Sequence, residues 1–202
     1  MSDTPSIWRA FANTRMLVCI ATGFSSGMPL YVLYQLLPAW LREGGVDLKT
    51  IGLFSLIGFP YPWKFLWSPL LDHIAPPILG RRRGWALITQ VALFIVLCSF
   101  GSFDPSKDIG SIAVVVGMVA FFSASQDIVL DAHRREILPD HELGLGNSMF
   151  VNAYRLSALV PGSLALIIAD HLPWSIVHLI VAAFMAVGVV TSLLMSEPEQ
   201  PP

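Results

Sequence analysis

Residues 109–131 read IGSIAVVVGMVAFFSASQDIVLD, and this stretch decides the fold. No charged side chain occurs in it before Asp127, and aliphatic, small and aromatic residues dominate it. A helix needs about 20 mostly apolar residues to cross the roughly 30 Å hydrocarbon core of a bilayer. The stretch therefore predicts a membrane-spanning helix, with Asp127 and Asp131 toward one of its ends.

The rest of the chain repeats this apolar pattern. The sequence is 54% hydrophobic and 13% charged, and its mean hydropathy is +0.66, whereas soluble domains carry about 25% charged residues. The first apolar run is too long for the roughly 7–15-residue core of a cleavable signal peptide, so we expect it to stay in the membrane. We expect an all-α integral membrane protein of six transmembrane helices, over residues 16–39, 50–71, 84–103, 109–131, 143–170 and 174–195.

The lysines and arginines are distributed unevenly around these spans. Seven of the twelve fall on one side of the membrane and three on the other, while Lys64 and Arg155 lie within spans. Because cytoplasmic loops carry the excess of positive charge, we expect a cytoplasmic amino terminus, and six crossings return the carboxyl terminus to the cytoplasm. This predicts a cytoplasmic segment 1–15, a six-helix domain 16–196 and a cytoplasmic tail 197–202.

Three charged residues lie well inside the expected spans: Lys64, Asp127 and Arg155. Each costs about 2.5–3.5 kcal/mol to insert near the centre of a bilayer, and such residues usually face a partner or a water-filled cavity. The Arg155 side chain is long enough to reach toward Asp127. We expect these three residues to handle substrate or protons, and the competing interpretation is an ion pair that only holds helices together.

Polar and small residues also follow a helical spacing. Ser123, Asp127 and Asp131 share one helix face because they are four residues apart, and we expect Asp131 to pair with Arg134 or Arg135 near the membrane surface. In the first span, GxxxG spacing of glycines 23 and 27 suits close helix packing. Prolines 60, 62 and 69 lie in the second expected span, where neighbouring helices are expected to satisfy the freed carbonyls.

Five segments together resemble a known family: LKTIGLFS (48–55), KFLWSPLLD (64–72), GRRRGW (80–85), SASQDIVLDA (123–132) and YRL (154–156). In this order and spacing they resemble the AmpG-type muropeptide permeases of the major facilitator superfamily. The resemblance implies a proton-driven importer of the bacterial inner membrane that carries anhydro-muropeptides for cell-wall recycling. The broader family includes acetyl-coenzyme A transporters, which leaves that substrate as an alternative. Because aromatic and amide side chains often bind sugars, Gln126 and Tyr154 join the expected substrate-handling residues, and the competing interpretation for each is an interface anchor or a packing residue.

The resemblance also implies a role for the loop between the second and third spans. In this superfamily the loop carries a signature that latches the two halves of the transporter together, and Asp72, Arg81, Arg82 and Arg83 occupy its place. The sequence departs from the signature, because Ser68 replaces its leading glycine and residues 73–79 lengthen it. These residues could form such a latch, or the positive charges of the arginines could only set the orientation of the chain in the membrane. Asp131 is grouped with them under the same two interpretations.

Members of the superfamily have two six-helix halves, each an inverted repeat of three plus three helices, with the substrate site between them. This chain resembles only the amino-terminal half. We expect it to work with a second six-helix half or as a homodimer, on a glycopeptide substrate and protons. The alternatives are a truncated product, a non-transporting remnant or an interaction subunit.

Other functional classes find no support in the sequence. It contains no HExxH or GxSxG motif and no pair of aspartates placed for catalysis across two spans, so we expect no enzyme activity. Cys19 and Cys98 lie in apolar runs and the five histidines lack ligand spacing, so we expect no metal and no cofactor. A net charge of −2 gives no indication of a nucleic-acid partner.

Overall fold

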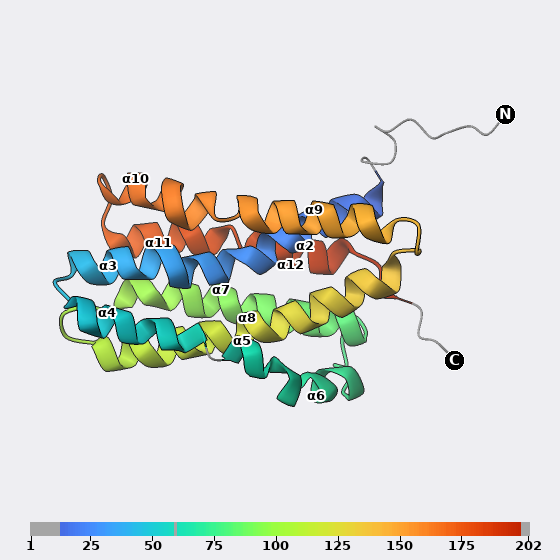
Figure 1. Ribbon diagram of the computed structural model, residues 1–202, viewed down its shortest axis with the longest axis horizontal. Helices are drawn as coiled ribbons and strands as arrows, with labels where there is room; N and C mark the ends of the chain where they lie inside the picture. Colours follow the sequence, from blue (N-terminus) through green and yellow to red (C-terminus); the bar gives the residue numbers. More distant parts are fainter. Residues whose placement is uncertain (1–12, 59, 199–202) are drawn as a thin grey trace.

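The computed structural model describes residues 13–58 and 60–198 as a bundle of helices that run along one long axis (Figure 1). Most of the expected amino-terminal segment 1–15, and residues 199–202 of the expected tail 197–202, lie outside the described residues. Within the described part, five helices are long and apolar enough to cross a membrane: Thr14–Glu43, Arg81–Ser102, Ile109–Ile137, Leu143–Ala169 and Trp174–Leu194. The expected all-α membrane architecture is therefore confirmed, and five of the six expected spans coincide with these helices.

Several of the long helices contain irregular turns. The first consists of α2 (Thr14–Tyr31), a π-helical turn η1 (Val32–Leu36) and α3 (Leu37–Glu43). The fifth expected span has the same construction, with α9 (Leu143–Leu156), a second π-helical turn η5 (Val160–Leu164) and α10 (Ala165–Ala169). The others are α7 (Arg81–Ser99) with η4 (Phe100–Ser102), α8 (Ile109–Ile137), and α11 (Trp174–Ala183) followed by α12 (Ala186–Leu194).

The expected second span, residues 50–71, differs from the expectation of one continuous helix. This region is divided into α4 (Leu48–Phe54), η2 (Ser55–Gly58), α5 (Pro60–Trp63), η3 (Lys64–Leu66) and α6 (Ser68–His73). Proline lacks an N–H donor and disfavours helical backbone at the residue before it, so the three prolines interrupt the helix. The prolines thus break this span into short pieces instead of being absorbed within a single helix.

The helices pack in a definite order around a shared core. Helix α2 contacts α9, α8 and α12, and α7 packs along α8. The described chain begins and ends at the same end of the bundle (Figure 1). Toward the opposite end, Trp40, Phe100 and His178 form a buried aromatic cluster, with the Trp40 and His178 ring centroids 4.7 Å apart.

Close packing of α2 against α9 depends on the two glycines of the GxxxG motif. A Cβ atom at Gly23 would collide with the backbone of Phe150, and one at Gly27 would collide with the Tyr154 carbonyl and the Ser157 hydroxyl. These contacts confirm the close helix approach expected from the spacing. The backbones come this near only because neither glycine carries a side chain.

The turn between α7 and α8 has the polar residues expected of it. The Asp104 carboxylate accepts hydrogen bonds from Ser106 and pairs with Lys107, whose Nζ lies 2.9 Å away. The Ser106 hydroxyl, followed by Lys107, stabilises the ionised carboxylate and lowers the pKa of Asp104 to about 2. The turn therefore stays charged over the physiological pH range, which suits a position outside the hydrocarbon.

Gly23→Ala is expected to destabilise the bundle, because overpacking of a close contact costs about 1–3 kcal/mol. The measurement is the midpoint of thermal unfolding of the purified protein in detergent. Gly117→Ala is the matched control: it also lies in a helix, but nothing is within 4 Å of an added Cβ. That change should be neutral or slightly stabilising, since alanine favours helix over glycine. Equal midpoints for the two variants would contradict the packing argument.

Candidate functional site

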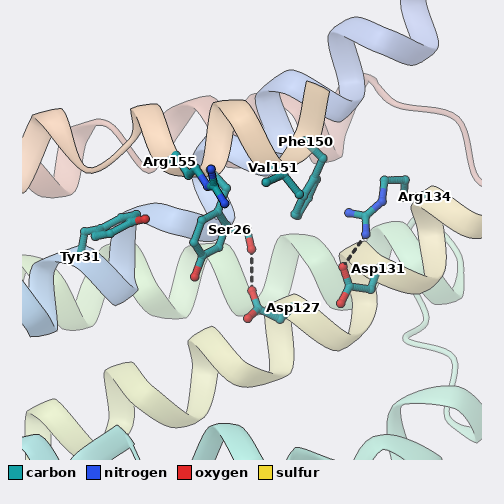
Figure 2. Close-up of a pocket in the computed structure, with 9 residues that line it drawn as sticks. Ser26, Tyr31, Asp127, Asp131, Arg134, Phe150, Val151 and Arg155 are labelled. Atoms are coloured by element: carbon teal, nitrogen blue, oxygen red, sulfur yellow. Dashed lines mark hydrogen bonds and ion pairs between the residues drawn. The ribbon is translucent and has the colours of Figure 1, made fainter. Parts of the chain in front are cut away.

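A cavity of about 410 Å³ lies between α2, α8 and α9 (Figure 2). This volume falls within the range of about 300–1,000 Å³ that is usual for small-molecule sites. Polar, charged and aromatic side chains all line it: Ser26, Tyr31, Asp127, Asp131, Arg134, Phe150, Val151, Tyr154 and Arg155. Of the residues expected to handle substrate or protons, Asp127, Tyr154 and Arg155 meet here, whereas Lys64 and Gln126 do not line the cavity.

The carboxylate of Asp127 is held by a neighbouring helix. The buried hydroxyl of Ser26 on α2 donates a hydrogen bond to Asp127 Oδ1 at 2.5 Å. Sequence reasoning missed Ser26. A usable signal was present, because Ser26 lies three residues after Gly23 and beside Gly27, and therefore on the face of α2 that packs closely against its neighbours. The hydrogen bond compensates part of the cost of placing the carboxylate at this depth.

Among the described residues, neither Lys64 nor Arg155 forms an ion pair with Asp127. Lys64, in η3, interacts electrostatically with Asp127 from outside the cavity lining. Arg155 is exposed at the cavity wall, and its side chain has no hydrogen-bond or ion-pair partner within the described part of the chain. A free guanidinium beside a cavity is a natural binding group for a carboxylate, to which it can donate two parallel hydrogen bonds.

Gln126 and Tyr154 have different surroundings. Gln126 is fully buried behind the cavity wall, and its amide donates a hydrogen bond to the Ser25 carbonyl at 3.0 Å. It thus connects α8 to α2. Tyr154 faces the cavity, and its ring meets that of Tyr31 edge to face, with centroids 5.8 Å apart.

The expected pairing of Asp131 with Arg134 is confirmed. Their Oδ1 and Nη2 atoms lie 2.9 Å apart at one end of the cavity (Figure 2). Arg134 also donates a hydrogen bond to Asn147 at 2.8 Å and lies 3.9 Å from the centroid of the Phe150 ring. The pair therefore ties the end of α8 to the start of α9.

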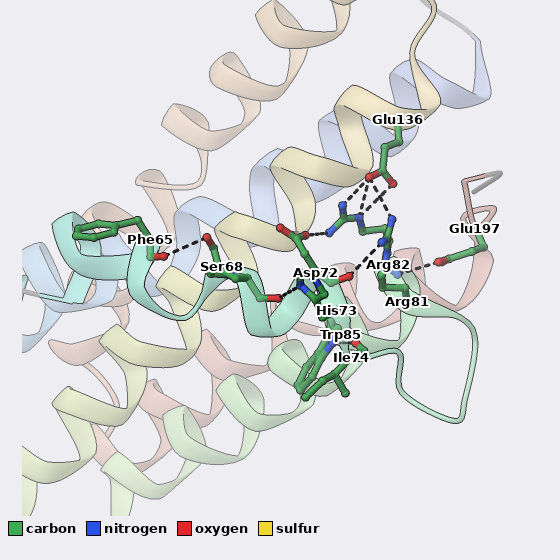
Figure 3. A network of polar contacts seen from close by, with 11 residues as sticks. Phe65, Ser68, Asp72, His73, Ile74, Arg81, Arg82, Trp85, Glu136 and Glu197 are labelled. Atoms are coloured by element: carbon green, nitrogen blue, oxygen red, sulfur yellow. Dashed lines mark hydrogen bonds and ion pairs between the residues drawn. The ribbon is translucent and has the colours of Figure 1, made fainter. Parts of the chain in front are cut away.

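A second polar network joins the ends of α6, α7 and α8 (Figure 3). Arg82, at the start of α7, has a side chain only 8% exposed and donates to Asp72 Oδ1 at 2.6 Å. Its other guanidinium nitrogens bind Glu136 of α8, with one contact of 2.5 Å. Arg81 donates to the Asp72 carbonyl at 3.1 Å. Asp72, Arg81 and Arg82 are thus brought together, while Asp131 lies apart from them.

Glu197 completes this network from the far end of the sequence. Its carboxylate accepts hydrogen bonds from the backbone N–H groups of Arg82 at 2.8 Å and Arg83 at 2.9 Å. An anion at this position satisfies unpaired donors and complements the dipole of the α7 amino terminus. The Arg83 side chain in turn donates to the carbonyls of Ser192 and Leu193 in α12. Sequence reasoning missed Glu136 and Glu197.

Arg82→Gln is expected to destabilise the protein, because it leaves Glu136 and Asp72 without their shared cation. Removing one partner of a buried ion pair costs about 3–5 kcal/mol, and since the Asp72 side chain is 44% exposed the lower end applies. For a chain of this size the midpoint of thermal unfolding should fall by about 6–12 °C. Arg135→Gln is the control, because its partner Asp140 is 89% exposed. Similar losses in both variants would show that charge alone, not the network, is responsible.

Comparison with known proteins gives consistent matches. The family model described as Major Facilitator Superfamily matches residues 62–202. An anhydromuropeptide permease of Escherichia coli strain K12 is 43% identical over 191 residues, which cover 94% of this chain and 39% of the permease. A Rickettsia conorii protein named putative transporter AmpG 1 is 32% identical over 177 residues, covering 86% of this chain and 42% of that protein.

A Haemophilus influenzae protein described only as an uncharacterized protein is 50% identical over 186 residues. The match covers 92% of this chain and 44% of the relative. The chain therefore spans less than half the length of the curated relatives that it matches.

Proposed function

Because this chain belongs to the Major Facilitator Superfamily, as an AmpG-type member, we propose that it forms one half of a proton-coupled transporter for anhydro-muropeptides. The observation that carries the proposal is Asp127, a carboxylate at the wall of a cavity between apolar helices. A carboxylate at this depth is costly and marks a pathway for substrate or protons. The transporter would act in the bacterial inner membrane and import its substrate into the cytoplasm.

The proposed half has six crossings in a three-plus-three inverted repeat. Residues 48–73 supply the crossing that the five long helices lack. An odd number of crossings would put the two ends of the chain on opposite sides, whereas α2 begins and α12 ends at the same end of the bundle (Figure 1). The distribution of lysines and arginines supports a cytoplasmic location for that end.

The substrate cavity is proposed to be closed by a second half. Substrate sites of this superfamily lie at the interface of two six-helix halves, and this chain covers 39% of the length of the Escherichia coli permease. The second half is proposed to be a different six-helix unit or a second copy of this one. The network of Asp72, Arg82 and Glu136 lies at the same end of the bundle as both described chain ends, where a latch between the halves would act.

Proton coupling is proposed to use the exchange between two states of Asp127. In the described state its carboxylate accepts the Ser26 hydroxyl. Protonation would neutralise the carboxylate and remove the cost of its charge while the helices move. Arg155 and Lys64 lie near enough to take part, Arg155 at the cavity wall and Lys64 through its electrostatic interaction with Asp127.

Uptake of labelled anhydro-muropeptide by cells that lack their own permease tests the proposal. This chain is compared alone and together with the carboxyl-terminal half of the Escherichia coli relative. Uptake by the chain alone indicates that two copies suffice, and uptake only in the pair indicates that a different second half is required. Absence of uptake in both, with the protein found in the membrane, would reject the proposed transport function.

Asp127→Asn is expected to abolish the dependence of uptake on the proton gradient, because an amide cannot bind and release the coupled proton. The measurement is initial uptake with and without a protonophore. Asp140→Asn is the control, since its side chain is 89% exposed and lies outside the cavity. Proton-dependent uptake that persists in Asp127→Asn would refute the coupling role.

A further inference from the structure

Three of the four tyrosines of the chain line two cavities. Tyr31 and Tyr154 line the 410 Å³ cavity from α2 and α9, and Asp127 lies in the same cavity wall. Their two helices are distant in sequence and meet at this cavity.

The tyrosines also connect two cavities. Tyr34 lines a second cavity of about 280 Å³ between the first long helix and the segment formed by α4 and η2. Its hydroxyl lies so close to Gly58 that a Cβ atom there would contact it. Tyr61, whose hydroxyl donates a hydrogen bond to Ser123 at 2.8 Å, lines neither of these two cavities. An elongated ligand that occupied both cavities would contact Tyr31, Tyr34 and Tyr154.

Irregular backbone supports this arrangement. Tyr31 is the last residue of α2 and Tyr34 lies within the π-helical turn η1, which packs against the second π-helical turn η5. Gly162 of η5 leaves room for the Gln35 side chain, which a Cβ atom there would displace. π-Helical turns inside α-helices occur frequently at functional sites.

The geometry of the rings indicates what they can bind. The Tyr31 and Tyr154 rings are inclined by 62°, so they offer two separate faces and no parallel slot for a flat base. A saccharide ring has a C–H face that packs on an aromatic ring and hydroxyl groups that need polar partners. Tyrosine supplies both an apolar face and a hydrogen-bonding hydroxyl, and Ser26 and Asp127 add polar atoms to the cavity.

We propose that Tyr31, Tyr34 and Tyr154 form a subsite for the saccharide part of the transported molecule. The inference rests on the proposed function and assigns the sugar-binding part of its site. Arg155 is the counterpart for the peptide part, since its guanidinium faces the cavity without a partner among the described residues.

Binding to the purified protein in nanodiscs tests the subsite, and the chain is reconstituted in the assembly that supports uptake, either as a homodimer or together with the second half. The probes are the complete muropeptide, its peptide-free disaccharide and its stem peptide alone, with affinities from calorimetry. Tyr31→Leu should weaken disaccharide binding about tenfold and leave the stem peptide unchanged, while Tyr31→Phe should stay within about twofold of the parent protein. Arg155→Gln should weaken binding of the stem peptide and leave binding of the disaccharide unchanged.

Two further variants make the result independent of folding defects. Tyr34 is 53% exposed, so Tyr34→Leu leaves the core intact and should give the same pattern as Tyr31→Leu. Phe94→Leu is the matched control, because Phe94 lies on α7, which does not line the cavity, and is 37% exposed. It should leave all three affinities unchanged.

The outcomes separate the subsite from the transport function. If the parent protein binds the muropeptide but both tyrosine-to-leucine variants weaken disaccharide and peptide equally, the subsite is wrong and the transport function stands. Tighter binding of coenzyme A than of the disaccharide would also overturn the subsite. If the parent protein binds none of the three probes, both the subsite and the proposed substrate are wrong.

Discussion

The close approach of α2 to α9 is the contact on which the rest of the structure depends. Gly23 and Gly27 let the two backbones meet, and α2 packs against α8 as well. This places the Ser26 hydroxyl within hydrogen-bond distance of Asp127. In a bilayer, where lipid tails are as apolar as leucine, such contacts between small residues replace the hydrophobic driving force. Helix packing and the chemistry of the cavity therefore have the same origin.

The same apolar surroundings favour hydrogen bonds between buried polar side chains of different helices. Ser192 of α12 donates a 2.6 Å hydrogen bond to Gln90 of α7, and Gln126 of α8 binds the Ser25 carbonyl of α2. These bonds cross between helices that are distant in sequence. A missing partner inside the bundle costs several kcal/mol, so each bond also fixes which helices are neighbours. Apolar residues allow many pairs of helices to pack together, and the polar residues select which helices become neighbours.

Apolar length was sufficient to predict five helices, and GxxxG spacing was sufficient to predict the contact around Gly23. The same spacing places Ser26 on the packed face of α2, but it does not show that this neutral hydroxyl, and not the charge of Arg155, meets Asp127. Glu197 was equally hidden, since capping of α7 by a residue 115 positions later follows from tertiary structure alone. Sequence patterns report on one helix at a time, whereas the site is defined by contacts between helices.

The broken segment 48–73 shows how such contacts replace regular structure. Its prolines remove helical hydrogen bonds, and α8 offers two serines in compensation: Tyr61 donates to Ser123 at 2.8 Å and Trp67 to Ser125 at 3.0 Å. Both bonds join the segment to α8 just before Asp127. Breaking and remaking two side-chain hydrogen bonds costs much less free energy than unfolding a continuous helix. Single side-chain hydrogen bonds thus attach this segment to α8 where the prolines interrupt its own helical hydrogen bonds.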